Sequence, residues 1–216
     1  AYMLTPVVKK LKARGHVFHN PNRLSNGQWN PLGVAKSKGT VRTVDRVVAF
    51  LECGEDLELF TPERVRLFAP MLDAKLMKRG WKQYADKVSS EAEATEMWAD
   101  DDVLMQIWSG DLDWLAEHVT GQYRERVDYI VSAAKHYDLR EEPRLLIGTI
   151  HSFKGAEADT VILAPNISPK AWETWRGPGG KQGEVRRLFY VGMTRARHRL
   201  VLLAPTRRGR CVSWAE

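Results

Sequence analysis

The chain has 216 residues, of which 44% are hydrophobic, and a formal net charge of +6. This length allows one or two domains with a buried core, and the basic charge balance suits a polyanionic partner such as nucleic acid. The sequence contains no apolar run of about 18 residues, which excludes a membrane-spanning helix, and its two distant cysteines exclude a disulfide framework or a Cys-rich zinc site.

The N-terminal residues predict a helix and then a short strand. Thr5-Pro6 is typical of a helix start, and Gly15 is typical of a helix end. Residues 16–20 predict a short strand, and the Asn, Pro, Gly and Ser residues of 21–39 predict a linker or an ordered loop. Because a helix starts almost at the first residue, we expect that the chain was cut from a longer protein.

Helices are expected from residue 40 to about residue 137. An apolar face at helical spacing precedes Gly54, which we expect to end the first of them. Thr61-Pro62 starts a second helix, which Pro70 must kink or split. The last helix of the block has apolar residues at helical spacing between Tyr123 and Ala134.

Two charged clusters in this block have alternative interpretations. Three acids, Asp100 to Asp102, resemble a metal site but better suit a helix N-terminus, where negative charge is stabilised. A second cluster combines cations with aromatic residues. It predicts either a nucleic-acid surface or, as we favour, a solvated face over buried rings. Its members are Lys75, Lys78, Arg79, Trp81, Lys82 and Tyr84.

The pattern changes after residue 141. Continuous apolar runs at 145–150, 160–164 and 200–203 predict strands of a parallel sheet that are covered on both faces. Residues 166–183 predict a loop, and residues 184–198 predict a helix. On this helix Arg195 would lie at the edge of the apolar stripe, about 20° from Leu188, where an arginine should pair or reach a ligand or another domain.

Two segments of this region resemble helicase motifs. Gly148–Val161 is similar to motif V, and Arg186–Arg197 to motif VI, of superfamily 1 DNA helicases of the UvrD, Rep and PcrA type. The resemblance implies an α/β fold: a RecA-like parallel sheet, the incomplete second motor domain, interrupted by a mainly helical inserted subdomain. The motor domain would comprise residues 1–21 and 141–216, and the insertion residues 22–140.

The resemblance also implies roles for particular residues. Arg195 would be the arginine finger, which stabilises the charge of the γ-phosphate in the transition state. Glu157 would contact the ribose of the nucleotide. Lys154 and Gly155 would shape the nucleotide-coupled loop, and Thr149 and His151 would touch the backbone of single-stranded DNA.

The nucleotide-binding half of such a motor is not found in the sequence. Gly180-Lys181-Gln182 does not form a phosphate-binding loop, and no strand ends in an Asp-Glu pair for Mg²⁺. We therefore expect the C-terminal fragment of an ATP-dependent DNA helicase or translocase that is inactive alone and has no cofactor bound. ATP and Mg²⁺ would act in the full-length protein.

The expected partners are single-stranded DNA, the missing N-terminal motor domain, and repair or replication proteins, with no membrane. Two free thiols predict a cytoplasmic location. The alternative function is a stand-alone, non-catalytic DNA- or protein-binding module derived from a helicase.

Overall fold

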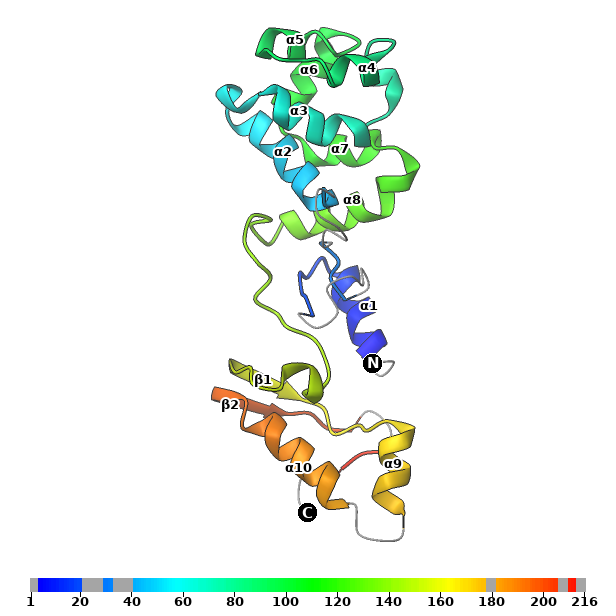
Figure 1. The fold of residues 1–216 in the computed structure, drawn as a ribbon, viewed down its shortest axis with the longest axis vertical. Coiled ribbons are helices and arrows are strands. Elements are labelled where there is room, and N and C mark those ends of the chain that lie inside the picture. Colours follow the sequence, from blue (N-terminus) through cyan, green and yellow to red (C-terminus); the bar gives the residue numbers. More distant parts are fainter. Residues whose placement is uncertain (1–3, 21–28, 33–40, 178–181, 206–209, 213–216) are drawn as a thin grey trace. The chain divides into compact units, whose positions relative to one another are not determined.

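The computed structural model describes residues 4–20, 29–32, 41–177, 182–205 and 210–212 (Figure 1). The chain divides into two compact units, one of Val7–Ile147 and one of Ala1–Pro6 with Gly148–Glu216. We call the first the helical unit and the second the strand unit. The sequence prediction instead grouped residues 7–21 and 141–147 with the strands. The discontinuous motor domain remains a prediction, because a division by compactness does not test it.

The helical unit contains a series of helices, drawn from blue to green in Figure 1. The helices expected between residues 40 and 137 are confirmed. The division of the chain cuts the first helix after Pro6. The helices are α1 (Thr5–Ala13), α2 (Thr43–Glu55), α3 (Pro62–Phe68), α4 (Trp81–Ala85), α5 (Glu91–Thr95), α6 (Asp101–Trp108), α7 (Leu112–His118) and α8 (Gly121–Ala134).

Capping side chains start several of these helices where the sequence predicts. The Thr61 hydroxyl accepts a hydrogen bond from the Arg64 amide at 3.5 Å, and α3 then passes into a 3-10 turn at Ala69–Met71, so Pro70 splits the predicted helix. The Asp100 carboxylate accepts from the Val103 amide at 2.9 Å. The acidic run therefore begins α6, as favoured over a metal site.

Aromatic side chains fill the centre of the helical unit, where α2 packs against α3, α6 and α8. Phe50 and Phe68 are fully buried, with an edge-to-face contact at 5.6 Å between ring centroids. Phe68 also stacks on Trp98 at 5.9 Å. Such buried rings remove large apolar areas from water and favour specific geometries, so they fix how the short helices pack.

Gly54 has a different role from the predicted one. The helix α2 continues to Glu55, so Gly54 lies inside it. A Cβ atom at Gly54 would lie 2.5 Å from the Cα atom of Gly110. The glycine is needed because the backbone of the turn after α6 approaches α2 too closely for any side chain.

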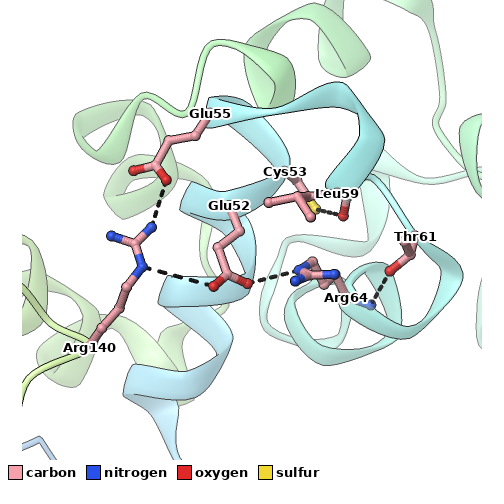
Figure 2. Close-up of polar contacts among 7 residues, drawn as sticks. All are labelled: Glu52, Cys53, Glu55, Leu59, Thr61, Arg64 and Arg140. Carbon is pink, nitrogen blue, oxygen red and sulfur yellow. Dashed lines mark hydrogen bonds and ion pairs between the residues drawn. The ribbon is translucent and has the colours of Figure 1, made fainter.

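A network of ion pairs joins α2 to α3 and to the segment after α8 (Figure 2). Glu52 accepts a hydrogen bond from Arg64 at 2.8 Å and lies 3.9 Å from Arg140. Arg140 also contacts Glu55 at 2.7 Å. The pairs are partly exposed, so each contributes about 0–1 kcal/mol to stability.

The cationic cluster of residues 75–84 covers a buried ring. Trp81 is buried, and the ammonium nitrogen of Lys82 lies 5.9 Å from its ring centroid. The side chains of Lys78 and Arg79 are exposed, and so is Tyr84. This arrangement agrees with the favoured interpretation, a solvated face over a buried aromatic residue.

The predicted strands at residues 16–20 and 145–150 are reduced to one isolated parallel bridge between His19 and Leu146. The His19 amide donates to the Leu145 carbonyl at 3.0 Å, and the Ile147 amide donates to the His19 carbonyl at 3.1 Å. The prediction of strands here was wrong, because the pairing does not extend beyond this single bridge. Most of the loop predicted at residues 21–39 lies outside the described residues.

The strand unit combines a small parallel sheet with two helices, which is consistent with part of an α/β domain. Strand β1 (Ala158–Leu163) pairs in parallel with β2 (Ala196–Leu202), and α9 (Pro169–Arg176) and α10 (Gln182–Met193) lie in the connection between them (Figure 1). Parallel strands need such a crossover. The expected cover on both faces is not found, since Ile162 is 61% exposed.

Two predicted elements of the strand unit were wrong. The region predicted as a loop at 166–183 contains α9, and the Ser168 hydroxyl caps it by accepting from the Ala171 amide at 3.1 Å. The helix predicted to reach residue 198 ends at Met193, because the chain from Ala196 onward pairs with β1 instead. Arg195 therefore lies in a turn and not on a helical stripe.

Candidate functional site

A polar turn leads into β1 and carries four of the predicted site residues. Ile150–Phe153 form a 3-10 turn, and Thr149 precedes it. The Thr149 and Ser152 hydroxyls are 3.0 Å apart, and the Thr149 amide donates to the Ser152 hydroxyl at 3.4 Å. These bonds fix the start of the turn, while the Thr149 and His151 side chains are exposed.

Gly155 is the last residue of the polar turn, which spans residues 149–155. Its φ is +85°, in the left-handed region that side chains disfavour, and nothing lies within 4 Å of where a Cβ would be. Backbone conformation therefore requires the glycine, not close packing. The preceding Lys154 is exposed beside it. The turn therefore places the exposed ammonium group of Lys154 next to the left-handed backbone of Gly155.

Helix α10 packs closely against the first residue of the 3-10 turn, Ile150. A Cβ at Gly192 would lie 3.1 Å from the Ile150 Cδ1 atom and 3.3 Å from the Leu163 Cδ1 atom. Val185 and Phe189 of the same helix are buried in the small core. The helix therefore holds the first residue of the turn and the end of β1 in one packed layer.

Arg195 lies in the turn between α10 and β2, half-buried and facing the start of β1. Its guanidinium donates to the carbonyls of Val191 at 3.1 Å and Ala156 at 3.5 Å, and to the Thr194 hydroxyl at 3.3 Å. The backbone adds a link in the other direction, since the Ala158 amide donates to the Arg195 carbonyl at 3.0 Å. Among the described residues Arg195 has no ion-pair partner, so no nearby carboxylate neutralises its charge.

Glu157 lies in sequence between Ala156 and Ala158, and both of these residues are hydrogen-bonded to Arg195. Its Oε2 atom accepts a hydrogen bond from Arg197 Nε at 3.1 Å, and both side chains are about half exposed. In the next register position His198 Nε2 lies 3.7 Å from Asp159 Oδ1. Acidic and basic side chains therefore pair at the start of the sheet, and the backbone on both sides of Glu157 is hydrogen-bonded to Arg195.

The pairing of the two strands is irregular at this point. Ala158 pairs with Ala196, whereas Thr160 pairs with Arg199, so β2 has one extra residue opposite β1. Such a bulge redirects side chains and is common beside functional sites.

The structure brings together the two predicted nucleotide contacts, Glu157 and Arg195, and places Thr149, His151, Lys154 and Gly155 in the turn that precedes them. Sequence reasoning missed Arg197. Its partner depends on the register of β1 and β2, and the only signal in the sequence was a second arginine two residues after Arg195.

The arrangement suits an anionic ligand that also carries hydroxyl groups. An arginine without a carboxylate partner can bind phosphate through its planar fork, and a carboxylate can accept hydrogen bonds from hydroxyls. Among the described residues, no three His, Cys, Asp or Glu side chains are grouped so that they could hold a metal ion. In the same part of the chain no helix has both the length and the apolar character to cross a bilayer.

Comparison with known proteins gives one match. The family model described as the UvrD-like helicase C-terminal domain matches residues 122–206, which include the polar turn, both strands and Arg195. Neither the curated proteins nor the solved structures gave a match to this chain.

Proposed function

We propose a function that proceeds from the family of this region: residues 122–206 form a UvrD-like helicase C-terminal region, and the chain supplies the second half of an ATP-dependent DNA motor. In this proposal the strand unit is part of a RecA-like second motor domain, and the helical unit is its inserted subdomain. A first motor domain would hold the phosphates of ATP and Mg²⁺. The small parallel sheet with crossover helices supports this assignment.

The observation that carries the proposal is the charge of Arg195. Three neutral oxygen atoms hold its guanidinium at the edge of the sheet, and no described carboxylate pairs with it. In this it differs from Arg64, whose guanidinium pairs with the Glu52 carboxylate at 2.8 Å. A guanidinium held in this way keeps its full attraction for an anion, which is the property that an arginine finger needs.

The other predicted residues have roles along the same edge. Glu157 would accept hydrogen bonds from the ribose hydroxyls. Thr149 and His151, exposed in the polar turn, would contact the backbone of single-stranded DNA, which is polyanionic and offers acceptor oxygens. In sequence, Lys154 and Gly155 lie between the proposed DNA contacts, Thr149 and His151, and the proposed ribose contact, Glu157. Movement of this turn would couple nucleotide binding to the DNA contacts.

Replacing Arg195 tests the proposal directly. The polypeptide should contain this chain together with its phosphate-binding motor domain. We expect Arg195→Ala to lower kcat for ATP hydrolysis at least about a hundredfold while KM changes by no more than about threefold, because a finger acts mainly on transition-state charge. Steady-state ATPase assays with single-stranded DNA give both constants.

Arg195→Lys is the matched variant, since it keeps the charge but loses the fork of donors. It should recover only a small part of the lost turnover. A turnover number unchanged in Arg195→Ala would remove this residue from the ATP site and with it the main support for the motor assignment.

A further inference from the structure

The bulge in β2 raises a question about Arg197, which has no role in the proposed function. A regular ladder would pair each residue of β1 with one of β2. Here Asp159 faces both Arg197 and His198, because Ala158 pairs with Ala196 and Thr160 with Arg199. Arg197, which lies in this bulge, contacts Glu157 at 3.1 Å.

We infer that Arg197 is a positioning residue that holds the Glu157 carboxylate in the orientation that binds the ribose of ATP. The inference rests on the proposed function, in which Glu157 contacts the ribose. Arg197 Nε donates to Oε2 only, and no residue in the described part of the chain donates a hydrogen bond to Oε1. Oε1 therefore keeps its lone pairs for a ribose hydroxyl.

The backbone around Glu157 is already fixed from both sides. The Ala156 carbonyl accepts from Arg195 at 3.5 Å, and the Ala158 amide donates to the Arg195 carbonyl at 3.0 Å. The rotamers of Glu157 are the remaining freedom. Arg197 restricts them before the nucleotide arrives, and a side chain that is ordered in advance binds its ligand more tightly.

Folding stability does not explain the pair. The side chains of Arg197 and Glu157 are 58% and 47% exposed. Ion pairs at such exposure contribute little to the free energy of unfolding. Replacement of Arg197 should therefore leave the fold intact, which makes the residue suitable for a functional test.

The test compares ATP with 2′,3′-dideoxy-ATP, which lacks both ribose hydroxyls, in the polypeptide that joins this chain to its phosphate-binding domain. We expect Arg197→Ala to raise KM for ATP about three- to tenfold, with kcat nearly unchanged and KM for the dideoxy nucleotide unaffected. Arg197→Lys should recover part of the loss. Arg199→Ala is the matched control: it removes an exposed arginine two residues along the same strand and should leave both constants as in the wild type.

Glu157→Ala separates failure of this inference from failure of the proposed function. It should abolish the preference for ATP over the dideoxy nucleotide, and adding Arg197→Ala should change nothing further. If Glu157→Ala keeps the wild-type preference, the ribose contact is wrong and the inference is overturned with it. If Glu157→Ala loses the preference but Arg197→Ala keeps it, Arg197 does not position Glu157, while the ribose contact stands.

Discussion

The helical unit and the strand unit bury their apolar side chains to different degrees. Among the described residues, the core of the helical unit holds 31 buried apolar residues, whereas the core of the strand unit holds five. The strands also leave Ile162, Leu200 and Leu202 exposed. The helical unit thus has a large hydrophobic core of its own, while the strand unit carries the charged start of the sheet on a small core. Most of the buried apolar side chains that stabilise the fold therefore lie in the helical unit, whereas the candidate site lies in the strand unit.

The largest expected effect of a single substitution is therefore in the helical unit. Phe68→Ala removes a fully buried ring that contacts Phe50 and Trp98, and should cost about 3–5 kcal/mol. Hydrogen exchange resolved by peptide is the suitable measurement, because a chain with two units need not unfold in one step. Protection should fall in α2 and α3 and stay unchanged in β1 and β2.

Phe189→Ala is the matched variant in the strand unit, where the ring packs in the small core. It should reduce protection in β1 and α10 only. Equal losses in both units after either substitution would mean that the two cores unfold together, and the contrast between the units would not hold for stability.

A smaller effect should distinguish two helical glycines that both lie at close approaches. At Gly54 a methyl group would lie 2.5 Å from the backbone of Gly110, which cannot yield without moving the turn after α6. We expect Gly54→Ala to cost about 1–3 kcal/mol. At Gly192 the nearest atoms belong to the side chains of Ile150 and Leu163, which can shift.

Gly192→Ala should therefore change the free energy of unfolding by less than about 1 kcal/mol, since the helix propensity of alanine offsets part of the crowding. Urea unfolding followed by far-UV circular dichroism, with hydrogen exchange to assign the unit, measures both variants. A larger loss for Gly192→Ala than for Gly54→Ala would show that the strand unit is packed more rigidly than its core size indicates.

The same contrast explains what could be predicted from the sequence. The helices of the 40–137 block were predictable because local signals decide them: the Thr61 and Asp100 caps and the proline at position 70 act within one turn of backbone. The parallel pairing of residues 160–163 with 199–202 was also predictable, since continuous apolar runs are typical of it.

The errors arose where distant parts of the chain determine the local structure. The helical pattern through Arg195 is overridden by pairing with β1, and the role of Gly54 depends on Gly110, far along the chain. The Glu157–Arg197 pair depends on the pairing of β1 with β2, which brings together residues 40 positions apart in the sequence. The specific roles of the polar turn and of Arg195 came from a resemblance of motifs, whereas their geometry required the register of the sheet.

The smallest expected effect concerns the two cysteines, one in each unit. Cys53 is buried in the helical core and its thiol donates to the Leu59 carbonyl at 3.6 Å (Figure 2). Burial raises the pKa of this thiol from 9.0 to about 12, and the positive charge of Arg64 opposes the rise only in part. Because the thiolate is the reactive species, iodoacetamide at pH 8 should modify the half-buried Cys211 first. Cys53 should react only as fast as the helical unit opens, which mass spectrometry of the two peptides would measure.

The raised pKa also fixes the sign of a pH effect on stability. A thiol that is harder to ionise in the folded state stabilises the fold fully below pH 9, and this contribution is lost as the pH rises from 9 toward 12. Cys53→Ala should remove that part of the alkaline loss, although it also lowers stability at every pH by removing a buried sulfur atom. Rapid modification of Cys53 at pH 8 without unfolding would show that the helical core admits solvent at this position, and would weaken the distinction between a sealed unit and an open one.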